Sequence, residues 1–314
     1  MRVHEGLAGL VPGLWRQPAV TVGVFDGLHR GHQHVLAHLG QLAARVGGEP
    51  VVITFATHPR AVIDRAAPRQ ILSVRHRLHL LSRLGIAGVV LLPFDDALRT
   101  MDHERFAEQV LVQGLRARAL LFGYNGSFGH GGAGTARTLE PLGARHGFLV
   151  EEAPPVAEGE RPISSSRIRD AIESGDLAGA GAMLGRPVAL YGTVVRGDGR
   201  GRQLGFPTAN VDLEGEILPP SGVYEVAVEV GGRRHRAVAN IGTRPTFTHG
   251  QPGVRPSLEV HVPGLEADLY GQALEVELVR HLRGERRFPS REALVAQVRS
   301  DIAAVLGGPP PGPA

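Results

Sequence analysis

The chain of 314 residues contains no cysteine and no lysine, so all 34 of its basic side chains are arginine. The lack of cysteine excludes disulfide bonds, thiolate zinc sites, iron–sulfur clusters and cysteine nucleophiles. The lack of lysine excludes lysine-anchored pyridoxal chemistry, Walker-type phosphate loops and the protein-kinase lysine. A protein of this composition that uses ATP must therefore bind the phosphates with other groups.

The sequence also has little net charge, although its isoelectric point is near 9.9. The formal charge is only +3, and no block of five or more arginines occurs. Four tyrosines are the only side chains that titrate between histidine and arginine, so a small positive excess persists to about pH 10. The high isoelectric point is therefore no sign of nucleic-acid binding, and we expect no nucleic-acid partner.

Long apolar runs are absent as well, since none approaches the roughly 18 residues of a membrane span. The N-terminus carries charge from Arg2 onward and is broken by Pro12, which is unlike a signal peptide. With 42% hydrophobic and 21% charged residues, the composition is that of a globular protein. These features predict a cytoplasmic protein without a membrane partner, and the length predicts about two domains.

In the first half of the chain, short apolar runs alternate with amphipathic stretches. Helical spacing of apolar residues predicts helices over His32–Val46, Val74–Leu84 and His103–Leu115. The runs between them are typical of buried parallel strands: Val20–Phe25, Val51–Phe55, Val89–Pro93, Ala119–Gly123 and Phe148–Glu151. This alternation predicts a Rossmann-like, doubly wound α/β domain over residues 1–186, with ligands at the carboxyl ends of its strands.

The period of the apolar pattern changes near residue 187. Apolar and polar residues alternate over Tyr224–Val230 and Leu274–Leu278, which predicts strands without intervening helices. An antiparallel β-barrel or sandwich over residues 187–306 follows from this pattern. A final helix is predicted to begin after Ser290 as its N-cap, and the Gly- and Pro-rich tail of residues 307–314 is predicted to be disordered.

The first candidate site is the string Gly23–His32, which lies between a predicted strand and a predicted helix. Gly27 and Gly31 let backbone N–H groups approach phosphates, and the helix N-terminus favours an anion. His29 and His32 are three residues apart, so both imidazoles can stabilise charge on one face as the α-phosphorus of a nucleotide is attacked. The alternative is a glycine turn with two surface histidines.

Two further segments lie where a nucleotide would be expected. Ile163–Arg169 combines serines at a helix start with arginines one turn later, which makes either an anion site or a plain N-cap with solvated arginines. Taken alone, the segment favours the plain N-cap. Asn125 directly follows the predicted strand Ala119–Gly123, at a carboxyl end where a ligand could be read.

The second candidate site is the string Gly197–Asn210. Its glycines can wrap phosphates without a Walker lysine, its arginines can supply charge, and Thr208 can offer a hydroxyl to Mg²⁺. A turn-rich hairpin loop is the alternative. A kinase also needs a base for the substrate hydroxyl. Glu259 interrupts an apolar strand, but on its pattern alone it is a solvated, outward-facing residue.

Together these strings resemble the bacterial bifunctional riboflavin kinase/FAD synthetase family, from about Val20 to Leu306. The first half resembles its FMN adenylyltransferase at Gly23–His32 and Ile163–Arg169. The second half resembles its riboflavin kinase at the following strings: Gly201–Asn210, Gly222–Tyr224, Ile241–Phe247, Leu269–Gly271 and Leu282–Phe288. Two specific sets of motifs in the family's order make coincidence a poor explanation.

The resemblance implies that riboflavin and ATP give FMN and ADP on a C-terminal antiparallel β-barrel. It implies that FMN and a second ATP then give FAD and pyrophosphate on the N-terminal α/β domain, both steps with Mg²⁺. It implies Glu259 as the kinase base, Thr208 and Asn210 as metal-binding residues, and His29 and His32 as catalytic residues of the adenylyltransferase. Asn125 is implied in flavin binding. The remaining residues, implied in binding ATP or its phosphates, are Gly23, Phe25, Asp26, Gly27, Gly31, Ser164, Ser165, Ser166, Arg169, Gly199, Arg200, Gly201, Arg202, Gly205 and Pro207.

One position departs from the family's pattern, because Gly126 stands where the family has an aromatic residue two before Phe128. The loop from His130 to Thr135 is also unusually rich in glycine. A riboflavin kinase with an impaired adenylyltransferase, and a non-catalytic flavin- or nucleotide-binding protein, are the alternatives to a bifunctional enzyme. The sequence leaves open whether the protein is a homo-oligomer and whether FMN is channelled between sites.

Overall fold

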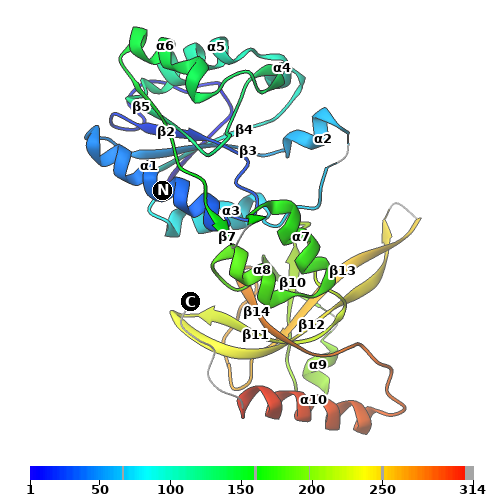
Figure 1. The fold of residues 1–314 in the computed structure, drawn as a ribbon. Coiled ribbons are helices and arrows are strands. Elements are labelled where there is room, and N and C mark those ends of the chain that lie inside the picture. Colours follow the sequence, from blue (N-terminus) through cyan, green and yellow to red (C-terminus); the bar gives the residue numbers. More distant parts are fainter. Residues whose placement is uncertain (66, 159–160, 198, 249–250, 308–314) are drawn as a thin grey trace. The chain divides into compact units, whose positions relative to one another are not determined.

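The computed structural model describes residues 1–65, 67–158, 161–197, 199–248 and 251–307 (Figure 1). Its contacts divide the chain into two compact units. The first consists of Met1–Arg69 and Val74–Ser165, and the second of Gln70–Ser73 and Ser166–Ala314. The predicted domain boundary after residue 186 stays a prediction, and the predicted disordered tail beyond Gly307 lies outside the described residues.

The first unit is built on a six-stranded parallel sheet, which confirms the predicted α/β fold. In spatial order its strands are β1 (Arg2–Glu5), β4 (Gly88–Leu92), β3 (Pro50–Phe55), β2 (Ala19–Val22), β5 (Ala119–Phe122) and β6 (Leu149–Glu152). The strand β1 was not predicted; it pairs in parallel with β4 at the sheet edge. Because β2 lies between β3 and β5, the strand order reverses there, and a ligand is expected at the carboxyl end of β2.

Helices cover both faces of this sheet (Figure 1). They are α1 (Arg30–Arg45), α2 (Pro59–Ile63), α3 (Val74–Arg83), α4 (Asp96–Thr100), α5 (His103–Phe106), the π-helix η1 (Ala107–Leu115), the 3₁₀-helix η2 (His130–Gly132) and α6 (Ala136–His146). The apolar stripe of α1, from Val35 to Ala43, is buried as its spacing predicts. The predicted helix over His103–Leu115 forms, but it changes from α to π geometry at Ala107. Two short strands, β7 (Ala157–Glu158) and β8 (Arg161–Pro162), pair antiparallel after β6.

The second unit is a closed six-stranded barrel, so of the two predicted architectures the barrel is confirmed. Around the barrel the strands are β10 (Ala209–Leu213), β13 (Gln251–His261), β12 (Arg233–Thr248), β11 (Gly222–Val230), β14 (Ala273–Arg283) and β9 (Ala189–Val195). All of their pairings are antiparallel. The helices α7 (Ser165–Ser174) and α8 (Leu177–Leu184) precede the barrel, and α9 (Arg200–Gln203) lies between β9 and β10.

The chain's last helix, α10 (Arg291–Leu306), begins where the sequence predicts. The Ser290 hydroxyl caps it by accepting a hydrogen bond from the Ala293 N–H at 3.2 Å. Burial along α10 is slight, with Asp301 and Val305 its buried residues. Polar contacts therefore take a large part in fixing this helix to the second unit.

A short segment of the first half, Gln70–Ser73, belongs to the second unit. Gln70 forms a parallel bridge with Glu216, and the Ser73 N–H donates to the Glu216 carboxylate at 2.8 Å. The same carboxylate accepts from the Tyr191 N–H at 2.9 Å and is only 5% exposed. A buried carboxylate satisfied by two backbone donors explains why this segment is fixed.

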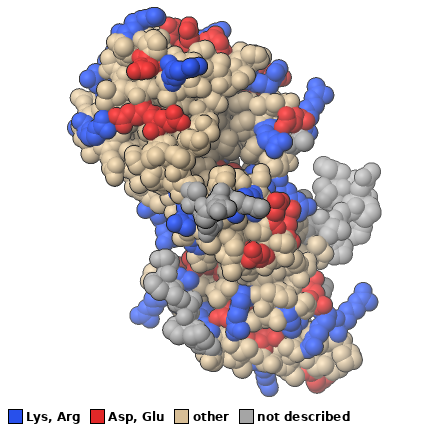
Figure 2. All heavy atoms as spheres, viewed as in Figure 1, with Lys and Arg blue, Asp and Glu red and all other residues tan. Residues whose placement is uncertain are grey.

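Charges of both signs are interspersed over each unit on the face drawn in Figure 2. All blue side chains in this view are arginine, since the sequence has no lysine. Among the helices in the described part of the chain, none has the length and apolar character needed to cross a membrane.

Candidate active sites

A cavity of about 820 Å³ opens in the first unit at the carboxyl ends of β2 and β5. Its lining includes Gly23, Phe25 and both histidines of the Gly23–His32 string. Further aromatic side chains line it from other strand ends and helices: Phe55, Phe94, Phe106, Tyr124 and Phe128. A mostly apolar cavity with a few polar groups at a switch point of a parallel sheet is typical of a site for a nucleotide or an aromatic cofactor.

The two histidines of this site lie against each other at the start of α1. Their rings stack with centroids 3.7 Å apart and an interplanar angle of 18°. His29 is the N-cap residue, and its Nδ1 accepts from the His32 N–H at 3.4 Å. The ring of Phe25 packs edge-on against His32 at 5.2 Å. Two imidazoles are thus presented to the cavity beside a helix N-terminus, where negative charge is stabilised.

The loop that carries the histidines has an unusual backbone. Phe25 and Leu28 have φ angles of 52° and 41°, a left-handed conformation that non-glycine residues rarely adopt, and Gly27 has φ 87°. Asp26 is buried with 4% exposure, and its carbonyl accepts a hydrogen bond from the Ser165 hydroxyl at 2.9 Å. The predicted ATP-binding residue Ser165 therefore contacts the loop itself.

Arg77 of α3 also contacts this loop, and no motif in the sequence singles it out. It is 4% exposed, and its guanidinium donates to the carbonyls of Val24 and Phe55, both at 2.5 Å. Burial lowers the pKa of Arg77 to about 10, while the Asp26 carboxylate acts in the opposite direction. Arg77 therefore still carries its charge at neutral pH.

The other predicted residues of the first site fall in different places. Ser164 belongs to the first unit, whereas Ser166 and Arg169 belong to the second, on α7. Asn125 is exposed, with φ 54°, and its N–H donates to the Glu152 carboxylate at 2.9 Å. The described lining of the cavity passes from Tyr124 to Gly126 and leaves out Asn125. The flavin-binding role of Asn125 stays a prediction.

In the second unit, three polar residues stand side by side across neighbouring strands of the barrel. Glu259 of β13 is paired with Asn210 of β10 on one side and with Asn240 of β12 on the other. Directly paired residues of antiparallel strands present their side chains on the same face. The Thr208 hydroxyl donates to the Glu259 carboxylate at 3.4 Å. Its strand pattern alone predicted that Glu259 is a solvated residue. In the structure Glu259 is instead half-buried in this polar row.

The glycine-rich loop packs closely against this row. A Cβ atom on Gly197 would lie 2.3 Å from the Asn210 amide, and one on Gly201 would lie 2.4 Å from the Phe206 carbonyl, so neither position accepts a side chain without movement. Gly199 and Gly205 have φ angles of 69° and 87°. Two of the glycines thus give room to the motif residues themselves.

The arginines of this loop are less informative. Arg202 is exposed, and the side chain of Arg200 lies outside the described part of the chain. The Pro207 carbonyl lies 2.8 Å from Nδ1 of His261, a residue two places beyond Glu259 on β13. Since alternate residues of a strand share a face, His261 fixes the segment before Thr208 on the side of the sheet that carries Glu259.

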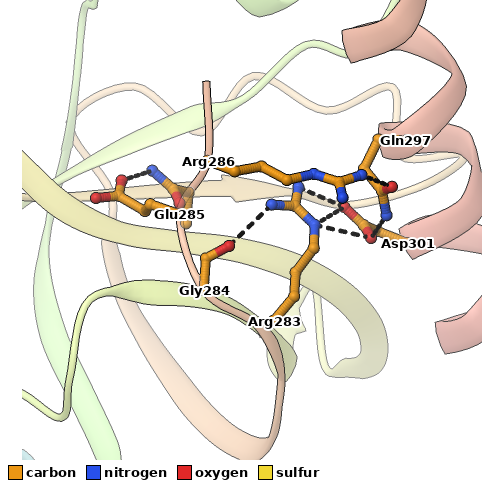
Figure 3. Close-up of polar contacts among 7 residues, drawn as sticks. Arg283, Gly284, Glu285, Arg286, Gln297 and Asp301 are labelled. Carbon is orange, nitrogen blue, oxygen red and sulfur yellow. Dashed lines mark hydrogen bonds and ion pairs between the residues drawn. The ribbon is translucent and has the colours of Figure 1, made fainter. Parts of the chain in front are cut away.

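The chain after β14 brings another carboxylate to the polar row (Figure 3). Glu285 accepts from the Asn240 amide at 3.1 Å. Beside it, the Arg283 guanidinium binds the Asp301 carboxylate of α10 with contacts of 2.8 to 3.2 Å. Gln297 donates to Asp301 at 2.7 Å. The motif over Leu282–Phe288 indicated that this segment matters, but sequence reasoning did not assign Asn240 or Glu285 to a site.

Comparison with known families divides the chain in the same order as its motifs. Residues 12–167 match the family described as FAD synthetase, and residues 184–306 match the family described as riboflavin kinase. Both matches cover the candidate residues of the corresponding half, apart from Arg169.

Full-length relatives carry both halves. The protein named bifunctional riboflavin kinase/FMN adenylyltransferase of Bacillus subtilis strain 168 is 34% identical over 286 residues, covering 90% of this chain and 89% of the relative. The protein of that name from Escherichia coli K12 is 35% identical over 303 residues, covering 96% of each. A crystal structure described as a macrolide-efflux protein from Streptococcus pneumoniae is similar with a TM-score of 0.80 at 29% identity, covering 98% of this chain and 100% of that one. That name belongs to the other protein, and the similarity shows that the two chains share a fold. With two family matches and full-length relatives above 30% identity, the chain belongs to the bifunctional riboflavin kinase/FMN adenylyltransferase family.

Proposed function

We propose that the protein phosphorylates riboflavin to FMN in its second unit and adenylylates FMN to FAD in its first, with ATP as co-substrate of both reactions. One observation carries the proposal: each unit brings together the chemical groups of its own family's motifs. In the barrel these groups come from segments that are far apart in the sequence. Thr208, Asn210 and Glu259 meet across β10 and β13, and His29 and His32 stack at the cavity.

In the kinase reaction, the primary hydroxyl of the ribityl chain attacks the γ-phosphorus of ATP, and ADP leaves. The Glu259 carboxylate is the base that accepts the hydroxyl proton. The Thr208 hydroxyl, which donates to Glu259, orients that carboxylate, and the loop that includes Gly199, Gly201 and Gly205 is the phosphate-binding segment. Arg200, Arg202 and Pro207 are further residues of this segment that we assign to ATP.

The oxygen atoms of Thr208 and Asn210 suit Mg²⁺, which prefers hydroxyl, carbonyl and carboxylate oxygens. The Thr208 hydroxyl contacts the proposed base Glu259, and Asn210 is paired with Glu259 across the strands, which supports this assignment. When bound, Mg²⁺ neutralises phosphate charge. Thr208 and Asn210 are therefore the residues that we propose hold the metal.

In the adenylyltransferase reaction, a phosphate oxygen of FMN attacks the α-phosphorus of ATP, and pyrophosphate leaves. No proton need be removed from an ionised phosphate, so the protein's part is positioning and stabilisation of charge. His29 and His32 donate hydrogen bonds to phosphate oxygens. The N–H groups of the Gly23–Gly31 loop, with Ser164 and Ser165, are proposed to bind the rest of the ATP, and Asn125 the flavin. The assignment of Ser166 and Arg169 to ATP stays a prediction.

The test is product analysis of the full chain with riboflavin, ATP and Mg²⁺. We expect FMN to form first and FAD later, and FMN added in place of riboflavin to give FAD directly. Chelation of Mg²⁺ by EDTA should stop both reactions, and excess Mg²⁺ should restore them. Chromatograms with neither FMN nor FAD would overturn the proposal, while FMN without FAD would leave only its kinase half. A cytoplasmic location, where ATP is available, and the oligomeric state stay predictions.

A further inference from the structure

In the loop between β2 and α1, every second backbone carbonyl from Val24 to Leu28 accepts a hydrogen bond from a side chain. The Val24 carbonyl accepts from Arg77 at 2.5 Å and from the Thr54 hydroxyl at 3.1 Å. The Asp26 carbonyl accepts from Ser165 at 2.9 Å, and the Leu28 carbonyl accepts from the Gln33 amide at 2.8 Å. The donors come from α3, β3, the start of α7 and α1, so the loop conformation is set by side chains of four different elements.

These hydrogen bonds matter because the loop is strained. The left-handed φ angles of Phe25 and Leu28 cost conformational energy, and such residues persist only where surrounding contacts fix them. Both strained residues lie at such a hydrogen bond. The carbonyl of Val24, the residue before Phe25, accepts from Arg77, and the carbonyl of Leu28 accepts from Gln33. The contacts therefore act where the backbone most needs support.

The hydrogen-bonded carbonyls also decide which way the loop's N–H groups point. In a planar trans peptide, the carbonyl of one residue and the N–H of the next point in opposite directions. Carbonyls of Val24 and Leu28 held toward Arg77 and Gln33 thus direct the N–H groups of Phe25 and His29 to the other side. Phe25 and His29 are both lining residues of the 820 Å³ cavity.

The contacts of Arg77 require a guanidinium, and a lysine side chain could not make both of them. Its planar guanidinium spans the ends of two strands, with one nitrogen on the Val24 carbonyl of the β2 end and another on the Phe55 carbonyl of β3. A lysine ammonium at this depth would be a single point charge without the fork, and burial would lower its pKa. The chain's exclusive use of arginine is thus compatible with a structural requirement at this position.

We propose that Arg77 and Gln33 are positioning residues of the adenylyltransferase, which hold the Gly23–His32 loop in the conformation that receives the phosphates of ATP. They touch neither the reacting atoms nor the flavin, and they act through the loop backbone. The inference rests on the proposed function of the first unit. It adds two residues that lie outside both of that unit's motifs, Gly23–His32 and Ile163–Arg169.

The test compares Arg77→Lys and Gln33→Ala in the full chain with two controls. Arg145→Lys and Gln41→Ala change exposed residues of the same types in the same unit. We expect kcat/KM for ATP in FAD formation to fall by about 10- to 100-fold in both test variants, because sub-ångström misplacement of phosphate-binding groups has effects of this size. KM for FMN and the rate of FMN formation from riboflavin should stay within about twofold of wild type, as in the controls.

A pH profile separates positioning from general damage. The Arg77→Lys variant should lose FAD formation on the alkaline side at a lower pH than wild type, because a buried ammonium loses its proton earlier than a guanidinium. Unchanged kinetics in both test variants, or an equal loss of FMN and FAD formation, would overturn the inference. Wild-type protein that makes FMN but no FAD would instead reject the proposed function of the first unit.

Discussion

The Thr208 hydroxyl donates a hydrogen bond to the Glu259 carboxylate, with 3.4 Å between the two oxygens. Fifty-one residues separate them, and the contact joins the end of the glycine-rich loop to the C-terminal part of the barrel strand β13. The strand register places Asn210 and Asn240 on either side of the same carboxylate. Glu259 is therefore the point at which the proposed metal-binding segment and the barrel meet.

Replacing Glu259 with glutamine should separate the two activities. The amide preserves size and hydrogen bonding but cannot accept the ribityl proton, so FMN formation should fall by about 10²- to 10⁴-fold. Conversion of added FMN to FAD should continue at the wild-type rate, as measured by chromatography. Glu266→Gln, an exposed acid in the same unit, is the control. Loss of both activities in Glu259→Gln would argue against two independent sites.

His29→Ala should have the opposite effect. FAD formation from FMN should fall by about 10²- to 10³-fold, since one donor to the developing phosphate charge is lost, while FMN formation persists. His29 also caps α1, so His29→Asn is the informative partner: asparagine is a good N-cap but lacks the imidazole. If His29→Asn forms FAD as fast as wild type, the cap and not the imidazole is what the reaction needs. His146→Ala, at an exposed histidine, is the control.

Both folds were predictable from the apolar pattern, because period and turn residues are local properties. The continuous runs Val51–Phe55 and Val89–Pro93 indicated buried parallel strands, and the alternation at Tyr224–Val230 indicated a barrel or sandwich. The sequence also predicted that His29 and His32 share a face, because they are three residues apart. The stacking of their rings was not predicted. The strand β1 was missed because an edge strand with mostly exposed residues has no apolar signal.

The rest depended on contacts between distant segments. Nothing local distinguishes Arg77 from the exposed Arg75 two residues before it, and only burial against Val24 and Phe55 does so. In the same way, Glu259 has the pattern of a solvated residue until the register with Asn210 and Asn240 is known. The contacts of such side chains with distant segments leave no periodic pattern in the local sequence, so the sequence alone does not identify them.

Gly126 allows a test of the impaired-adenylyltransferase alternative. Its N–H donates to the Gly123 carbonyl at 2.7 Å, and a Cβ at this position would lie 2.8 Å from that oxygen. The turn must therefore shift to accept any side chain, and both glycines line the cavity. We expect Gly126→Ala and Gly126→Phe to slow FAD formation by about tenfold or more without affecting FMN formation.

The control for this pair is Gly40→Ala in α1, where a Cβ would meet no atom within 4 Å. There FAD formation should be unchanged, and alanine should stabilise the helix by up to about 1 kcal/mol. Faster FAD formation in Gly126→Phe would show that the family's aromatic residue is what this site lacks. That result would support a kinase with a weakened second activity.

Asp301 should link the stability of the second unit to its kinase activity. Its carboxylate accepts from the Arg283 guanidinium and from Gln297, and Asp301 is 6% exposed (Figure 3). Asp301→Asn removes the charge and leaves Arg283 without its ionic partner, which should lower the free energy of unfolding by about 1.5–3 kcal/mol. Denaturant unfolding of the full chain measures this loss.

The same substitution should also slow FMN formation, because Arg283 and Glu285 lie two residues apart and Glu285 contacts Asn240 of the polar row. Release of Arg283 from α10 frees the segment that places Glu285, whereas FAD formation from FMN in the first unit should not change. Asp212→Asn, at an exposed acid on β10, is the control. It should change the free energy of unfolding by no more than a few tenths of a kcal/mol and leave the rate of FMN formation unchanged. A destabilised Asp301→Asn protein with unaltered FMN formation would show that α10 supports the barrel without supporting its active site.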